Sequence, residues 1–80
     1  MEFIIVMMEG AKLYNEGQKS EKVYSIEEYG DYTYEEIAEK AKKENYGYYV
    51  TGFKYVCTIN GTVYVRELDE NSDFVKETQI

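Results

Sequence analysis

The chain contains no histidine, no proline, no tryptophan and only one cysteine. Without histidine it lacks the side chain that most often acts as a general acid or base near neutral pH, and Cys57 has no histidine to activate it. The glycine-rich phosphate-binding patterns of P-loop and dinucleotide-binding proteins are also missing. We therefore predict that the chain is not an enzyme and binds no cofactor.

The single cysteine and the short apolar runs predict where the chain resides. One cysteine cannot form an internal disulfide, and its apolar strand context favours a small buried hydrophobe over a reactive thiol. The longest apolar run, residues 3–8, is too short to span a bilayer. With no recognisable signal peptide, we expect a cytoplasmic protein without a membrane partner, in the host cytoplasm if it is encoded by a phage.

The size and charge indicate one small acidic domain. We expect residues 1–80 to form a single domain with a modest core. Sixteen acidic residues against nine basic residues give a net charge of −7, which argues against direct nucleic-acid binding because such proteins carry clustered lysine and arginine. The charge permits a protein partner with a basic surface, although solubility alone also explains it.

Residues 48–68 predict a β-hairpin. Asn60-Gly61 separates two runs rich in Val, Tyr and Thr, and this pair favours a two-residue type I′ turn. The register expected from that turn pairs Ile59 with Thr62, Cys57 with Tyr64, Val56 with Val65, Tyr55 with Arg66, and Lys54 with Glu67.

Both faces of this hairpin carry apolar residues. The face expected to form the core holds Phe53, Tyr55, Cys57, Ile59, Tyr64 and Leu68. The other face holds Val50, Val56, Val63 and Val65 beside Lys54, Thr58 and Glu67. A one-sided antiparallel sheet should alternate apolar and polar residues, so a second layer, a second subunit or a partner covers these valines, unless they only reflect strand propensity. Val56, Val63 and Val65 are thus candidates for a homodimer face.

The rest of the chain predicts an α+β fold, a small antiparallel sheet with one helix packed on one face. Residues 2–9 predict a strand buried on both faces beside the hairpin. Residues 19–24 predict an edge strand or a mobile loop, and residues 74–79 a last strand or a frayed end. A β-grasp-like arrangement is the alternative.

Two capping-box patterns precede the helical segment. Ser25 with Glu28 predicts at most one turn, whereas Thr33 with Glu36 predicts a helix over residues 33–45 that ends at Gly47. Two i,i+4 ion pairs are expected on this helix, Glu36 with Lys40 and Glu39 with Lys43.

Residues 24–39 hold six carboxylates and four tyrosines with no lysine or arginine among them. Such a stretch can imitate a phosphate backbone, with carboxylates in place of phosphates and tyrosine rings in place of base faces. An ordinary acidic helix start, favoured by the helix dipole, is the competing explanation. The predicted partner-binding residues are Glu27, Glu28, Tyr29, Asp31, Tyr32, Glu35, Glu36 and Glu39.

Asp69, Asn71 and Asp73 have the spacing that opens an EF-hand calcium loop. The pattern then fails, because Phe74 stands where the loop needs glycine and Ile80 where it needs a bidentate glutamate. We predict a polar turn and no metal site.

The whole chain resembles, in type, the small acidic inhibitors that phages and mobile elements carry against host defence, such as anti-CRISPR and anti-restriction proteins. The resemblance lies in the short length, the acidic and tyrosine-rich residues 24–39, the lack of catalytic groups and the strand, helix and hairpin layout. It implies a non-catalytic inhibitor that binds a nuclease or a CRISPR effector and blocks its substrate site. The alternative is a homo-oligomeric structural or interaction protein that assembles through the second face of its sheet.

Overall fold

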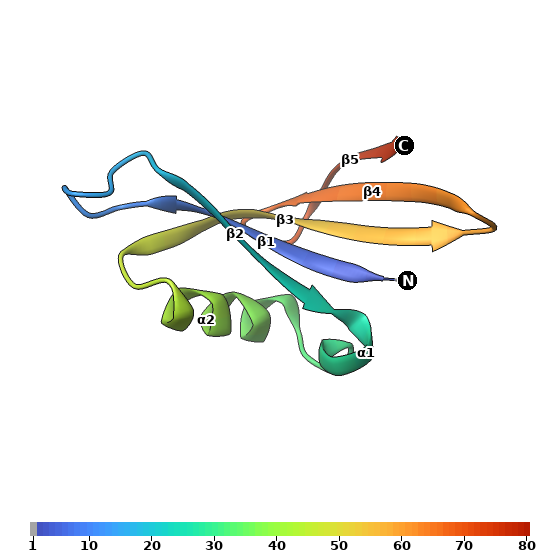
Figure 1. The fold of residues 1–80 in the computed structure, drawn as a ribbon, viewed down its shortest axis with the longest axis horizontal. Coiled ribbons are helices and arrows are strands. Elements are labelled where there is room, and N and C mark those ends of the chain that lie inside the picture. The colour runs from blue at the N-terminus through green and yellow to red at the C-terminus, as the bar shows by residue number, and fades with distance from the viewer. Residues whose placement is uncertain (1) are drawn as a thin grey trace.

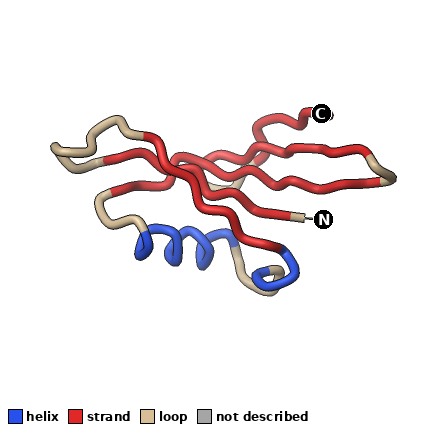
Figure 2. The backbone as a smooth tube through the Cα atoms, viewed as in Figure 1, coloured by secondary structure: helices blue, strands red, loops and turns tan. Residues whose placement is uncertain are grey.

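The computed structural model describes residues 2–80 and contains five strands and two helices. In chain order they are β1 (Phe3–Gly10), β2 (Lys19–Ser25), α1 (Ile26–Tyr29), α2 (Tyr34–Glu44), β3 (Tyr48–Ile59), β4 (Thr62–Asp69) and β5 (Phe74–Gln79). The strands form one antiparallel sheet in the order β2-β1-β3-β4-β5, and both helices lie on the same side of it (Figures 1 and 2).

This architecture is α+β, as the sequence predicts, but it has two helices where one was expected. The additional helix, α1, is four residues long. The β-grasp-like alternative is wrong, because that arrangement needs parallel first and last strands side by side, whereas β1 and β5 are not neighbours and every pairing is antiparallel.

The hairpin of β3 and β4 has the predicted register. Asn60 and Gly61 have φ values of 51° and 81°, as a type I′ turn requires. All five expected cross-strand pairs, from Ile59 with Thr62 to Lys54 with Glu67, are present. The local turn signal was therefore sufficient to align the two strands.

A β-bulge interrupts the pairing of β1 with β3. Met7 pairs with Gly52, but Met8 pairs with Val50, so Thr51 is the extra residue. The Thr51 hydroxyl donates a hydrogen bond to the Met7 carbonyl (3.3 Å). The bulge shifts the alternation of β3 and brings Val50 onto the helix-covered face, where it packs against the core. The prediction that Val50 lies on the opposite face is therefore wrong.

Helix α2 begins at the predicted capping box. Thr33 Oγ1 accepts a hydrogen bond from the Glu36 N–H (3.1 Å), and the Glu36 carboxylate accepts one from the Thr33 N–H (2.9 Å). The chain then turns at Gly47, whose φ of 91° suits glycine. Ile37 and Ala41 face the sheet and are almost fully buried, which fixes α2 against it.

The core lies between α2 and one face of the sheet. Its buried apolar side chains are Ile4, Val6, Met8, Tyr24, Ile37, Ala41, Phe53 and Leu68. Strand β1 contributes every second residue to this core. Phe3, Ile5 and Met7 alternate with them on the opposite side and are only half-buried, so the prediction of a strand buried on both faces is wrong.

The two segments for which the sequence allowed either a strand or a loop or frayed end are both edge strands. Residues 19–25 pair with β1, and residues 74–79 pair with β4. The loop between β1 and β2 is fixed by the buried Asn15, whose Oδ1 accepts a hydrogen bond from the Lys12 N–H (3.0 Å). Gly10 is required there, because a Cβ atom would lie 1.8 Å from the Asn15 carbonyl oxygen.

Replacing Phe53 by alanine is expected to lower the free energy of unfolding by about 3–5 kcal/mol, because the ring fills the centre of the core and its loss leaves a cavity. Urea unfolding followed by circular dichroism measures the change. Phe74→Ala is the matched control: this ring is 62% exposed, and its loss should cost less than about 1 kcal/mol. Equal losses in the two variants would contradict this placement of the core.

Candidate functional site

The acidic stretch, residues 24–39, runs from the end of β2 through α1 to the first turns of α2. Ser25 starts α1 by accepting a hydrogen bond from the Glu28 N–H (3.3 Å), and Thr33 starts α2. The two caps hold the stretch as successive helical turns joined by a short loop. Its six carboxylate side chains are all exposed: Glu27, Glu28, Asp31, Glu35, Glu36 and Glu39.

Two of these carboxylates are engaged within α2. Glu36 closes the capping box, so its expected ion pair with Lys40 is not formed. Glu39 lies 2.7 Å from the Lys42 Nζ atom and pairs with that residue rather than with Lys43. The hydrogen bond and charge of Lys42 lower the pKa of Glu39. These two side chains are therefore weaker candidates for a partner contact.

The other four carboxylates, on Glu27, Glu28, Asp31 and Glu35, form no ion pair with any lysine or arginine of residues 2–80. Three of them lie on α1 and the loop after it, and the fourth lies in the first turn of α2. These four carboxylates have neither an ion pair nor the capping role of Glu36.

The two tyrosines of the predicted site lie in different environments. Tyr29 is half-buried and contacts the buried Tyr24 edge to face, with 5.1 Å between ring centroids, and the Lys40 Nζ atom lies 5.7 Å from its centroid. Tyr32 packs on Tyr29 at 5.4 Å and remains 48% exposed. Tyr32 is therefore the ring available to a partner, and Tyr29 supports it.

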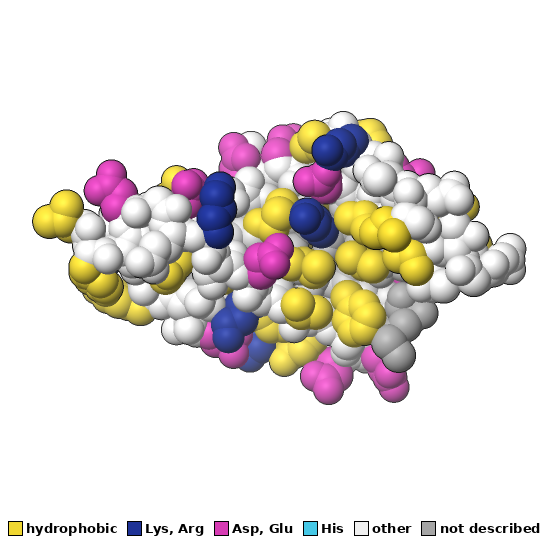
Figure 3. All heavy atoms as spheres, turned by 45° about the horizontal axis from the view of Figure 1, so that its top comes forward, with side chains coloured by type: hydrophobic (Ala, Val, Ile, Leu, Met, Phe, Trp, Pro, Cys, Tyr) yellow, Lys and Arg dark blue, Asp and Glu magenta, His cyan; other side chains and the backbone are white. Residues whose placement is uncertain are grey.

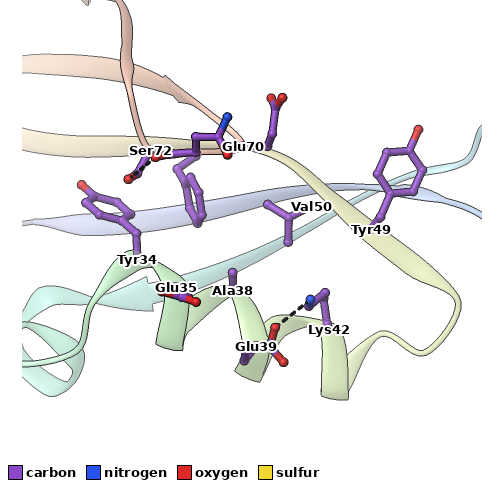
Figure 4. A pocket seen from close by; sticks show the side chains of 11 residues that line it. Tyr34, Glu35, Ala38, Glu39, Lys42, Tyr49, Val50, Glu70 and Ser72 are labelled. Atoms are coloured by element: carbon purple, nitrogen blue, oxygen red, sulfur yellow. Dashed lines mark hydrogen bonds and ion pairs between the residues drawn. The ribbon is translucent and has the colours of Figure 1, made fainter.

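A cavity of about 570 Å³ adjoins the acidic stretch, between α2, β3 and the turn that joins β4 to β5 (Figure 4). Its apolar lining comes from Ala38, Val50 and Phe53, and Tyr34 flanks it. Tyr49 lies at its edge with the ring turned away from α2, where its hydroxyl donates a hydrogen bond to Glu9 (3.0 Å) (Figure 4). The cavity is large enough for one side chain of a partner to enter.

The charged rim of this cavity is mainly acidic. Glu35 and Glu39 come from α2, and Glu70 lies on the strand side with its carboxylate turned away from the helix (Figure 4). Lys42, which is paired with Glu39, is the only basic residue of the lining. Glu70 was not among the predicted site residues, and its only signal in the sequence is the acidic turn that follows β4.

That turn has the structure expected of a polar turn. Asp69 Oδ1 accepts hydrogen bonds from the N–H groups of Asn71 (2.8 Å) and Asp73 (3.0 Å). Within residues 2–80 no three or more acidic or cysteine side chains are grouped as metal ligands would be.

The three valines proposed as an oligomer face are brought together. Val56 pairs with Val65, and Val63 follows on the same side of β4. They lie on the sheet face that the helices do not cover. We name this face the open face. Its other apolar residues are Phe3, Ile5, Met7 and Val23.

Cys57 lies on the helix side of the hairpin but beyond the helices. It is half-buried rather than buried as predicted, and its thiol is free. With Tyr55, Tyr64 and other residues it lines a second hollow of about 500 Å³. The helices do not reach this part of the hairpin, so the side chain keeps partial contact with solvent (Figure 1).

Comparisons of the chain with protein-family models, with curated proteins and with solved structures found no match. Neither described helix has the length and apolar character needed to cross a bilayer.

Because Tyr24, the first residue of the acidic stretch, is buried, we expect the stability of the fold to depend on alkaline pH. Burial raises the pKa of Tyr24 above its ordinary value of about 10, and the hydrogen bond that its hydroxyl donates to Glu44 (2.5 Å) raises the pKa further. The unfolded chain ionises this tyrosine first, so the stability it contributes is present below about pH 10 and is lost as the pH rises through the folded-state pKa.

Urea midpoints measured from pH 8 to 12 test this expectation. The wild-type midpoint should fall above about pH 10, and Tyr24→Phe should flatten that fall because the titrating hydroxyl is gone. Tyr14→Phe removes a hydroxyl from a ring that is 74% exposed and serves as the matched control. An identical alkaline decline in all three proteins would show that Tyr24 does not carry the effect.

Proposed function

We propose that this chain is a non-catalytic inhibitor that binds the basic surface of a nucleic-acid-handling enzyme or complex and blocks its substrate or target site. The observation that carries the proposal is the set of four exposed carboxylates on α1, the loop and α2 that have neither a basic partner within residues 2–80 nor a capping role. Carboxylates held at helical spacing can occupy the positions of backbone phosphates in a basic groove.

The net charge of −7 supports the same proposal through the rate of encounter. A concentrated negative field accelerates association with a basic protein and weakens as salt screens it. The same charge opposes direct contact with DNA or RNA, so the proposed partner is a protein, such as a nuclease or a CRISPR effector. Under this proposal the chain acts in the cytoplasm where that partner works.

The cavity beside α2 suggests how the contact is anchored. A lysine or arginine side chain of the partner would meet Glu35 at the rim, the ring of Tyr34 at one side, and an apolar lining below. Cations bind well over aromatic faces, and arginine and tyrosine are frequent hot-spot residues. The exposed ring of Tyr32 would add a second anchor next to the carboxylates.

Reversing two unpaired charges, Asp31→Lys with Glu35→Lys, is expected to weaken partner capture at least about tenfold, because both groups would then repel a basic surface. The matched control is Glu16→Lys with Asp73→Lys, which gives the same net charge from two exposed acids outside the site. Circular dichroism confirms that both variants are folded.

The capture experiment uses the cytosolic proteins that DNA-cellulose retains, passed over the immobilised chain at about 0.1 M salt, where surface charges are only partly screened. We expect wild type and control to capture the same proteins, duplex DNA to displace them and high salt to release them. Undiminished capture by the Asp31 and Glu35 variant, or capture that DNA does not displace, would refute the proposal.

A further inference from the structure

The open face combines apolar and charged side chains, and no helix of the described chain covers it. One row across the five strands consists of Ser25, Phe3, Val56, Val65 and Thr78. The next row consists of Val23, Ile5, Lys54, Glu67 and Lys76. Figure 3, which turns this side toward the viewer, shows hydrophobic side chains gathered around a few charged ones. Such a face is unusual for a sheet exposed to water on one side, where polar residues should alternate with apolar ones.

The charges on the open face nearly balance. Its basic residues are Lys19, Lys54 and Lys76, and its acidic residues are Glu9, Glu21, Glu67 and Asp69. Lys76 lies 3.2 Å from Glu67 and Lys19 lies 3.8 Å from Glu9, so opposite charges pair within the face. The acidic excess of the chain lies elsewhere, largely on the helix side. A second molecule of the same charge can therefore approach the open face without strong repulsion.

The area of the open face fits a stable dimer. Each outward residue of a sheet occupies a cell of about 4.8 by 6.8 Å, so about 20 outward positions give a projected area on the order of 600 Å². The accessible area exceeds this projected area because the side chains protrude from the sheet. The result is of the order of the about 800 Å² that each partner of a standard interface buries.

We propose that a second copy of this chain covers the open face. The two sheets pack face to face at about 10 Å, as in a β-sandwich, and give a helix-sheet-sheet-helix dimer. Val56, Val65 and Phe3 form the most apolar row of this interface. The helices and both acidic stretches remain on the outside of the dimer.

Sedimentation equilibrium of the full chain from about 1 μM to 1 mM, the range in which interfaces of this size dissociate, tests the proposal. We expect a mass that rises from the monomer's 9.4 kDa to twice that value. Val56→Lys and Val65→Lys should each raise the dissociation constant at least about 100-fold, because two-fold symmetry places two added unpaired charges in the apolar row of the interface. Ile59→Lys is the control, since this exposed side chain lies on the opposite side of β3.

A more conservative variant tests the same interface in case the lysine variants do not fold. Val56→Thr with Val65→Thr keeps the side-chain shape and the strand propensity, and it should weaken the dimer about tenfold. A chain that stays monomeric at about 1 mM, or a dimer that all these variants leave unchanged, would overturn the proposal. The Asp31 and Glu35 variant should dimerise as wild type does, which separates this inference from the proposed inhibitor function.

Discussion

Helix α2 is too short to cover the sheet on which it packs. Its 11 residues span about 16 Å at 1.5 Å per residue, whereas the molecule is 44 Å long. The fully buried core is therefore concentrated where Val6, Ile37 and Phe53 meet, beneath β1 and the middle of β3. The outer part of the hairpin and the whole open face depend on backbone pairing and cross-strand contacts.

This constraint gives the molecule two surfaces of different character. A chain of 80 residues has enough material for one layer of helix, and that layer covers one side of one part of the sheet. Each helix carries carboxylates in its first turn, where the helix dipole favours them. One of these, Glu36, is needed to cap α2. Helix dipole and capping do not account for Asp31, which lies in the loop between the helices, or for Glu70, which lies across the cavity.

Local sequence signals predicted local structure well. Asn60-Gly61 fixed the hairpin register because its turn type allows one alignment, and Thr33 with Glu36 fixed the start of α2 because the hydrogen bonds are made within one turn. The exposure of the six carboxylates also followed from their charge. These features need no information from distant parts of the chain.

The features that were missed depend on contacts between distant segments. Val50 changes face because β1 aligns with β3 through a bulge at Thr51, whereas a regular strand without the bulge would place Val50 on the same face as Val56. Glu70 reaches the cavity because the β4–β5 turn lies near α2, and Tyr29 is half-buried because Tyr24 on β2 packs against it. Each of these contacts is set by tertiary packing, which the residue pattern of a single element does not encode.

The separation of charge between the two surfaces is the strongest reason to regard both as functional. Solubility requires only net charge, and carboxylates spread evenly over the molecule would supply it. Here lysines such as Lys54 and Lys76 share the open face with acids, whereas residues 24–39 contain none. A face whose charges nearly balance permits contact with an identical molecule, and a distant acidic face attracts a basic one. The two proposed contacts therefore need different charge distributions and lie on opposite sides of the same sheet, so one molecule can make both at once.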